Sequence, residues 1–262
     1  MKAIILAAGK GTRLNSLTQH NPKCLVSLFG KTILKHQLDT FQKCGIRDIS
    51  VVRGYKGDMI NFQNVHYFDN PKFASTNMVE TLFCAKEKFN DSVIVSYGDI
   101  IFESTVLEKL INSVHDVSIV IDKHWKTYWE KRFENPLDDA ESLSIDIDNN
   151  ISSIGQKITN VDDICGQYIG LMKFQGKAIT NILSMYEQLY EQYAKQNKIS
   201  EFQNWYMTDF LQYYINSGFK IKPVSIDNGW LELDTVEDYN LYNELYKTDT
   251  LTDFIDLKSE II

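Results

Sequence analysis

The alternation of short apolar segments with longer amphipathic ones constrains the fold of this chain more than any other sequence feature. Parallel strands need crossover helices between them, and the apolar residues between the strand-like segments recur with a helical period. The pattern predicts an α/β fold with a mostly parallel sheet and helices on both faces. The predicted strands are residues 2–6, 48–52, 65–68, 92–96 and 117–121, and the predicted helices are residues 32–44, 77–89 and 106–114.

The pattern changes after Asp122, where we expect a smaller, mixed region built on strands 143–154 and 167–174. Helices are predicted at 179–193, 206–217 and 236–246, a strand at 219–226 and an extended piece at 230–233. A single α/β domain often reaches ~250 residues, so we assign residues 1–246 to one domain. The tail 247–262, whose role is unknown, is either a docking helix or a frayed end.

The composition narrows the class of partners. The formal net charge of −8 argues against a nucleic-acid partner, because phosphate backbones require a basic surface.

The sequence contains no run of ~18 apolar residues, so no membrane span is predicted. The first apolar run is too short for a signal peptide. The cysteines are widely separated, which is typical of a reducing compartment, so we expect a cytoplasmic protein. They are Cys24, Cys44, Cys84 and Cys165.

The loop that follows the first strand, with the sequence AAGKGTRL at residues 7–14, is a candidate anion site. Gly9 and Gly11 allow close approach of the backbone to a ligand, and successive N–H groups can surround an anion. Lys10 and Arg13 add positive charge. A dinucleotide fingerprint is excluded because it needs glycine at the position of Leu14. The alternative interpretation is a tight turn with an exposed basic pair.

Lys23 follows Pro22, which fixes the backbone directly before it. A lysine held a short distance after an anion loop is a candidate phosphate ligand, although a solvated loop lysine would have the same sequence.

Acidic residues follow two apolar segments. Asp99 follows the predicted strand 92–96, and ligands of open α/β sheets bind beyond the carboxyl ends of the strands. Glu232 and Asp234 would lie on the same side of an extended segment. Such carboxylates suit Mg²⁺, while a helix cap or a turn is the alternative for each of them.

Residues 123–132 are dense in aromatic and basic side chains. This segment suits a small polar ligand or an oligomer interface, and an ordinary amphipathic helix that covers the sheet is the alternative.

Together these residues resemble the nucleotidyltransferases that make NDP-sugars, whose pattern is LAAGxGxRL followed by xPK. Within that family the chain is similar to the small CTP-using branch, which includes the phosphocholine and 2-aminoethylphosphonate cytidylyltransferases, through residues 70–73 and Asn77. It also resembles the capsule phosphoramidate cytidylyltransferases that act on L-glutamine phosphate, in residues 76–86, 122–143, 167–174 and 206–212. It departs from some relatives in having a single aspartate in SYGD, where they have two.

The resemblance implies a Rossmann-like nucleotidyltransferase fold, mostly parallel and mixed, with a small acceptor-binding insertion. It implies Mg²⁺-dependent (or Mn²⁺-dependent) transfer of CMP from CTP to a small phosphorylated acceptor, with L-glutamine phosphate as the best match. Pyrophosphate would leave, and the CDP-linked product would serve capsule or surface-polysaccharide modification. No nucleic acid or membrane is expected as a partner, and a homodimer is left open.

The resemblance and the motifs together assign the site residues. Lys23 and Arg13 are the catalytic candidates. The nucleotide-binding candidates are Leu6, Ala7, Ala8, Gly9, Lys10, Gly11, Thr12, Gly54, Tyr55, Asn77 and Gly98. The acceptor-binding candidates are Lys123, Trp125, Trp129, Arg132, Tyr168 and Trp230. The metal-binding candidates are Asp99, Asp234 and Glu232.

Other functions stay open at this point. A phosphocholine or phosphonate cytidylyltransferase and a sugar-phosphate uridylyl- or thymidylyltransferase have the same loop. A glycosyltransferase is disfavoured by the loop and Lys23 together. An inactive nucleotide-binding regulatory module would be expected to lack Lys23 or the metal acids, and this chain has all of them.

Overall fold

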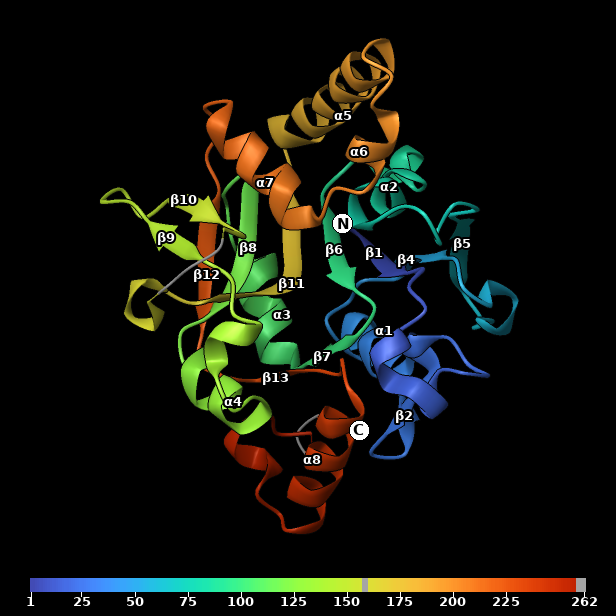
Figure 1. Cartoon of the computed structure of the whole chain (residues 1–262), viewed down its shortest axis with the longest axis vertical. Helices are drawn as coiled ribbons and strands as arrows, with labels where there is room; N and C mark the ends of the chain where they lie inside the picture. Colours follow the sequence, from blue (N-terminus) through green and yellow to red (C-terminus); the bar gives the residue numbers. More distant parts are fainter. Residues whose placement is uncertain (157–159, 258–262) are drawn as a thin grey trace.

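The computed structural model describes residues 1–156 and 160–257, which form layers of helices around one central sheet (Figure 1). The sheet has seven strands in the order β12-β8-β11-β6-β1-β4-β5, and all neighbours run parallel except at β11. This architecture confirms the predicted α/β fold class. The strands are β1 (Lys2–Ala7), β4 (Asp48–Arg53), β5 (Val65–Asp69), β6 (Val93–Tyr97), β8 (Val117–Asp122), β11 (Gln167–Phe174) and β12 (Lys222–Ile226).

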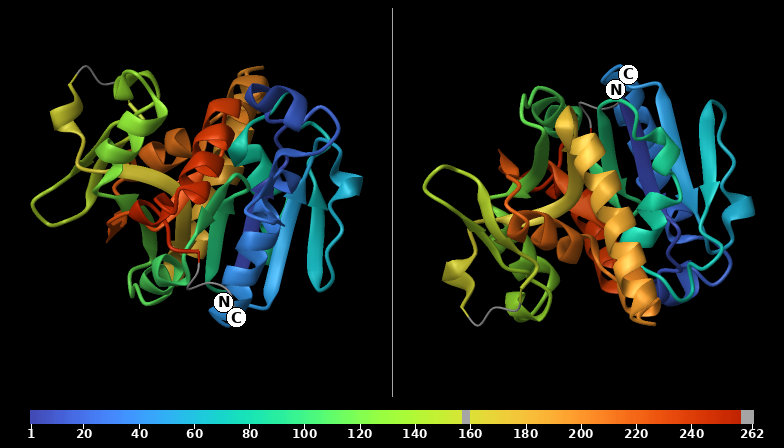
Figure 2. Two further views of the ribbon diagram at one scale, coloured as in Figure 1. Left: turned by 90° about the horizontal axis from the view of Figure 1, so that it is seen from below. Right: turned by 90° about the horizontal axis from the view of Figure 1, so that it is seen from above.

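The side chains of β1 divide between the two faces of the sheet, as the twofold period of a strand requires. Ala3 and Ile5 enter the core on one face, while Ile4 and Leu6 enter the core on the other. Figure 2 shows the long helix α5 lying across the second face. The first face is covered by α1 (Ile33–Lys43), α3 (Ser104–Ile111), α4 (Trp125–Arg132) and α8 (Val236–Lys247), and the second by α2 (Met78–Phe83), α5 (Lys177–Lys195), α6 (Ile199–Gln203) and α7 (Met207–Asn216).

The prediction that residues 167–174 belong to a smaller region is wrong. β11 pairs antiparallel with both β6 and β8 and is therefore a central strand of the main sheet. Residues 143–154 do form a separate hairpin, with β9 (Leu143–Ile145) and β10 (Ile151–Ile154). Its turn is held by Asp146, whose carboxylate accepts hydrogen bonds from the main-chain N–H groups of Asp148 and Asn150. Two further short strands, β2 (Ser27–Leu28) and β3 (Lys31–Thr32), form another hairpin.

The helix predicted from residue 77 is shorter than expected. Asn77 caps α2, as predicted, by accepting from the N–H of Met78. Glu80 does not complete the capping box, because its carboxylate accepts hydrogen bonds from Tyr186 Oη (2.9 Å) and Gln203 Nε2 (3.1 Å) instead. α2 ends at Phe83, and a separate 3₁₀ turn covers Lys86–Lys88.

The described part of the C-terminal tail is docked and not frayed. A 3₁₀ turn covers Leu251–Asp253, and Phe254 and Ile255 are buried against the first core. The N–H of Gly229 donates to the carbonyl of Phe254 at 2.7 Å. Residues 258–262 lie outside the described part. Among the helices of the described residues, none combines the length and the apolar character that crossing a membrane would require.

Gly170 provides a test of the central position of β11. Its φ is +80°, and a Cβ there would lie 2.5 Å from the ring of Tyr97 on the adjacent strand. We expect Gly170→Ala to lower the free energy of unfolding by about 2–5 kcal/mol, through backbone strain and overpacking. Urea denaturation measures the loss.

The matched control is Gly218→Ala. Gly218 also has a positive φ of +86°, but a Cβ there would meet nothing within 4 Å. Only the strain of the left-handed conformation applies, which is about 1–2 kcal/mol. Equal losses in the two variants would contradict the packing against Tyr97.

Candidate active site

Three carboxylates from distant parts of the sequence meet at one edge of the sheet. Asp99 follows β6 and precedes β7 (Ile100–Phe102), which pairs antiparallel with β13 (Trp230–Glu232). The pairing sets Glu232 opposite Ile100, and the N–H of Leu233 donates to the carbonyl of Asp99 at 2.9 Å. One oxygen from each of Asp99, Glu232 and Asp234 lies within 4.8 Å of the others. The structure therefore unites all three predicted metal residues.

The two predicted catalytic cations contact this cluster. Lys23 Nζ lies 2.7 Å from Asp99 Oδ2 and also donates to Asp234 Oδ1. Arg13 donates to the other carboxylate oxygen of Asp234. Gly11 makes this arrangement possible, because its φ is +64° and a Cβ there would lie only 2.9 Å from Lys23 Cβ. The glycine loop therefore packs directly against Lys23.

The electrostatics of the cluster depend on how well each charge is compensated. Burial alone would lower the pKa of Lys23, but Asp99, Asp234 and Glu232 outweigh it and raise that pKa. Burial would raise the pKa of Asp234, but Lys23 and Arg13 hold it below the ordinary value. Burial and the neighbouring Asp234 raise the pKa of Glu232, against the opposing effect of Arg132. Glu232 is therefore less well compensated than Asp234.

Buried groups behind the cluster fix the position of Glu232. Arg132, whose side chain is fully buried, donates to Glu232 Oε2 at 3.0 Å and to both oxygens of Asp238 at 2.9 and 3.1 Å. The hydroxyl of Tyr128 accepts from the N–H of Glu232, and the hydroxyl of Tyr242 donates to its carbonyl. Both the side chain and the main chain of Glu232 are thus held by the core.

The cluster fits a small divalent cation. Asp99 Oδ1 is buried and has no hydrogen-bond partner among the described residues. Oxygen donors of this kind suit hard cations that also bind substrate phosphates, and such a cation would neutralise phosphate charge. Lys23 now occupies the space between two of the acids, so a bound cation requires Lys23 to move.

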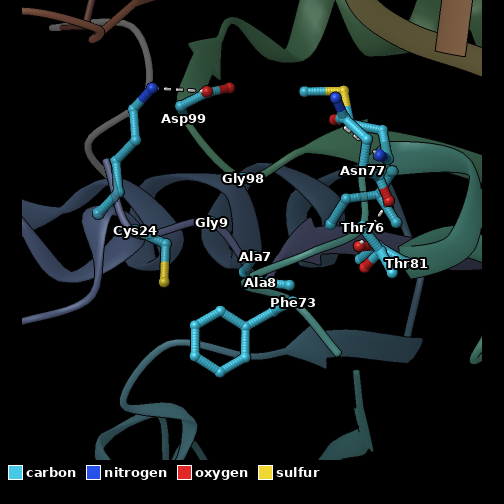
Figure 3. Close-up of a pocket in the computed structure, with 13 residues that line it drawn as sticks. Ala7, Ala8, Gly9, Cys24, Phe73, Thr76, Asn77, Thr81, Gly98 and Asp99 are labelled. Atoms are coloured by element: carbon cyan, nitrogen blue, oxygen red, sulfur yellow. Dashed lines mark hydrogen bonds and ion pairs between the residues drawn. The ribbon is translucent and has the colours of Figure 1, made fainter. Parts of the chain in front are cut away.

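A pocket of about 130 Å³ opens beside the cluster (Figure 3). In this view Asp99 lies on one side of the pocket and Asn77, Thr76 and Thr81 lie on the opposite side, with Phe73 beneath. Many of the predicted nucleotide residues line it, and so do several that were not predicted. The lining consists of Leu6, Ala7, Ala8, Gly9, Lys23, Cys24, Phe73, Thr76, Asn77, Met78, Thr81, Gly98 and Asp99.

Five predicted nucleotide residues do not line this pocket: Lys10, Gly11, Thr12, Gly54 and Tyr55. The N–H of Tyr55 donates to the carbonyl of Ala8, so this residue supports the loop from behind. Its hydroxyl donates to Gln19, and Lys10 lies over its ring at 5.6 Å. Sequence reasoning missed Phe73, Thr76 and Thr81 as lining residues, although residues 70–73 and 76–86 already carried the family resemblance.

A second pocket of about 180 Å³ lies on the other side of the cluster. It shares Met78 with the first pocket and reaches Arg13, Glu232 and Asp234, so the two pockets meet at the carboxylates. Three predicted acceptor residues line it, namely Trp129, Tyr168 and Trp230. The lining residues that were not predicted as site residues are Met78, Tyr97, Asp139, Glu141, Gln167, Ile169, Gly170, Tyr206 and Thr208.

The other three predicted acceptor residues lie elsewhere. Lys123 is exposed and does not line the pocket. Trp125 is buried in the core, because α4 turns its aromatic side toward the sheet. Arg132 is held behind Glu232 by its ion pairs, so it contacts the site through Glu232.

Known proteins are similar to this chain in sequence. Residues 3–145 match the MobA-like NTP transferase domain. The chain is 40% identical to a CTP:phosphoglutamine cytidylyltransferase from Campylobacter jejuni, over 93% of this chain and 100% of that protein. It is 32% identical to a choline-phosphate cytidylyltransferase from Streptococcus pneumoniae, over 44% of this chain and 52% of that protein.

Solved structures share the fold. The CTP:phosphocholine cytidylyltransferase from Streptococcus pneumoniae superposes with a TM-score of 0.69 at 21% identity, covering 94% of this chain and 98% of that one. The inositol-1-phosphate CTP transferase from T. maritima has a TM-score of 0.69 at 19% identity, covering 97% of each chain.

Replacing Lys23 should strengthen cation binding. Lys23→Met removes the ammonium that now lies between Asp99 and Asp234. We expect the ligand-free variant to bind Mn²⁺ roughly tenfold more tightly or better, because the cation no longer competes with a bound charge. Electron paramagnetic resonance of free Mn²⁺ measures this affinity. Lys10→Met, a change in the exposed loop, is the control, and unchanged or weaker Mn²⁺ binding by Lys23→Met would refute the cation site.

Replacing Arg132 should destabilise the fold. Arg132→Met leaves Asp238 and Glu232 without their buried partner. Removing one member of a buried ion pair costs about 3–5 kcal/mol, and we expect a loss of that size in urea denaturation. Lys131→Met, at the exposed neighbouring position on α4, should change stability by no more than ~0.5 kcal/mol. A loss below about 1 kcal/mol in Arg132→Met would speak against the anchoring role.

Proposed function

Because the chain belongs to the MobA-like NTP transferase domain family, we propose that it is a cytidylyltransferase acting on a small phosphorylated acceptor. An oxygen of the acceptor phosphate attacks the α-phosphorus of CTP, and the bond from that phosphorus to the oxygen bridging it to the β-phosphorus breaks. Pyrophosphate leaves, and a CDP-linked product forms. The observation that carries the proposal is the 40% identity to a CTP:phosphoglutamine cytidylyltransferase over the whole length of that protein.

The reaction needs positioning and charge neutralisation more than proton transfer. A terminal phosphate carries negatively charged oxygens at neutral pH, so the attacking oxygen is already a nucleophile. The chain then has to align two anions and stabilise the charge that develops between them. We assign this role to Lys23 and Arg13, which lie where the two pockets meet.

We assign the first pocket to the cytidine and the glycine loop to the triphosphate. The main-chain N–H groups of Gly9 and Lys10 donate to no group in the described part of the chain. They are therefore available to phosphate oxygens, and the Lys10 side chain adds charge beside them. Gly54 and Tyr55 act as support for the loop in this proposal.

We assign Asp99, Asp234 and Glu232 to Mg²⁺, for which Mn²⁺ can substitute. The buried, unpartnered Asp99 Oδ1 supports this assignment. When bound, the ion supplies neutralising charge to the phosphates. Lys23 is then free to turn from the acids toward the acceptor phosphate.

We assign the second pocket to the acceptor and propose L-glutamine phosphate as that acceptor, in line with the name of the 40% identical relative. Phosphocholine is the alternative suggested by the other relative. A cytoplasmic location, expected from the cysteine pattern, and a capsule or surface-polysaccharide role for the product, implied by the resemblance, belong to the same proposal, and a homodimer stays open.

Turnover tests the proposal directly. With CTP, Mg²⁺ and L-glutamine phosphate, pyrophosphate release should depend on all three components. Lys23→Ala and Asp99→Asn should each lower kcat/KM by roughly 10³-fold or more, because each removes charge stabilisation at the reacting phosphates. Lys195→Ala and Asp148→Asn, at exposed positions far from the pockets, serve as controls and should behave as wild type. Rates near wild type in Lys23→Ala would exclude the assigned role.

Nucleotide competition tests the base. CTP should be preferred over UTP, dTTP and ATP when each is offered with the same acceptor and pyrophosphate is followed. Equal use of UTP, together with turnover of a sugar phosphate, would identify a sugar-phosphate uridylyltransferase instead.

A further inference from the structure

One buried carboxylate, that of Asp238, contacts two groups that hold the acids of the cluster. Asp238 is 2% exposed and lies in the first turn of α8. Its Oδ2 accepts hydrogen bonds from the main-chain N–H groups of Asp234 and Thr235, both at 2.9 Å. Its Oδ1 accepts from Arg132 Nε at 2.9 Å, and Oδ2 accepts from Arg132 Nη2 at 3.1 Å. Four donors therefore fix this carboxylate in one orientation.

The start of α8 explains why Asp238 reaches back to Asp234. Thr235 is the N-cap of α8, and its hydroxyl accepts from the N–H of Asp238 at 3.0 Å. The carboxylate of Asp238 accepts from the N–H of Thr235 in return, which completes a capping box. The same carboxylate takes one further N–H, that of Asp234. The main chain of Asp234 is therefore set by the hydrogen bonds that begin the helix.

Arg132 connects Asp238 to Glu232. Two guanidinium nitrogens, Nε and Nη2, donate to Asp238 as a planar fork, and Nη1 donates to Glu232 Oε2 at 3.0 Å. The other carboxylate oxygen of Glu232, Oε1, accepts no hydrogen bond from the described residues. Because Asp238 takes the larger share of the guanidinium, Glu232 keeps one oxygen for another cation.

Both connections lead to the proposed cation site. One holds the main chain of Asp234 and the other holds the side chain of Glu232, and both begin at Asp238. Mg²⁺ requires near-ideal octahedral geometry with oxygen distances of ~2.0–2.1 Å, whereas Ca²⁺ accepts distances of ~2.3–2.6 Å in a more flexible arrangement. Two acids that are fixed relative to one another therefore favour the smaller ion.

We propose that Asp238 is a positioning residue that fixes the spacing between Glu232 and Asp234 and makes the site select a small divalent cation over Ca²⁺. The inference rests on the cation assignment within the proposed function and adds the residue that sets the selectivity. Asp238 acts through the two acids, since its own oxygens are occupied by main-chain and guanidinium donors. Groups that orient metal ligands in this way determine metal affinity.

The test measures cation binding to the full-length, ligand-free protein. Electron paramagnetic resonance follows Mn²⁺, which prefers the same oxygen ligands as Mg²⁺, and Ca²⁺ is measured by its competition with Mn²⁺. Asp238→Asn keeps the side-chain shape but replaces one acceptor oxygen with an NH₂ group, so it cannot accept from all four donors. We expect the affinity for Mn²⁺ to fall roughly tenfold or more. The affinity for Ca²⁺ should fall by no more than ~threefold, so the Mn²⁺/Ca²⁺ affinity ratio falls.

A second variant tests the connection through Arg132. Arg132→Lys keeps the positive charge but lacks the planar fork that reaches two acids at once, so it should lower the Mn²⁺/Ca²⁺ affinity ratio as well. A variant that only unfolds more easily lowers both affinities by the same factor, because both ions bind the folded chain. The ratio is therefore unaffected by a purely structural defect.

Two controls lie in the same part of α8. Glu237→Gln, at the exposed position beside Asp238, should leave both affinities unchanged. Thr235→Val removes the capping hydroxyl but leaves the main-chain donors of Thr235 and Asp234 in place. It should lower the melting temperature followed by circular dichroism and leave the Mn²⁺/Ca²⁺ affinity ratio at the wild-type value.

The outcomes separate this inference from the proposed function. If Asp238→Asn and Arg132→Lys keep the wild-type ratio, the positioning role is refuted, and the cytidylyltransferase function stands. A lack of measurable Mn²⁺ binding by ligand-free wild type would also overturn the inference, because the acids would then not be held ready for a cation. The proposed function fails on a different result, namely that no CMP passes from CTP to a phosphorylated acceptor, and that result leaves the measured ratio intact.

Discussion

The mutual repulsion of Asp99, Glu232 and Asp234 is the constraint on which the rest of the site depends. Carboxylates within 4.8 Å of one another are stable only when cations compensate them. The chain does this from two sides, with Arg132 buried behind Glu232 and with Lys23 and Arg13 in front. Asp238 holds Arg132 in place, whereas Lys23 and Arg13 border the two pockets. The cluster is therefore anchored on one side by buried groups and bordered on the other side by the two pockets.

The sequence predicted the parts of the fold and site that are local. Strand-helix alternation revealed the parallel half of the sheet, and the glycine loop and Lys23 were found because they are contiguous motifs next to a strand. β11 was misplaced because an antiparallel strand buried on both faces has the same apolar pattern as a strand of a peripheral region. The strands that pair with β11, β6 and β8, are set by the topology of the whole sheet, and a local sequence pattern does not reveal them.

The pockets show where prediction from sequence ends. Residues 123–132 were expected to face the acceptor, but composition does not reveal which side of α4 turns inward, and the structure turns Trp125 and Arg132 into the core. Glu141 has no motif around it. Its position depends on Gln167, which lies 26 residues later in the chain. Side chains that meet through tertiary packing carry no spacing signal.

The docked C-terminal segment has a consequence for how the protein is handled. Phe254 packs against Tyr128 with ring centroids 5.5 Å apart, and its carbonyl accepts from Gly229, directly before β13. Tyr128 in turn holds the main chain of Glu232. The last described turn therefore supports the segment 230–234, which contains two of the three acids, Glu232 in β13 and Asp234 directly after it. Shortening the chain there, or fusing a bulky affinity tag that loosens it, would disturb the carboxylate cluster, so a tag is better placed at the other terminus.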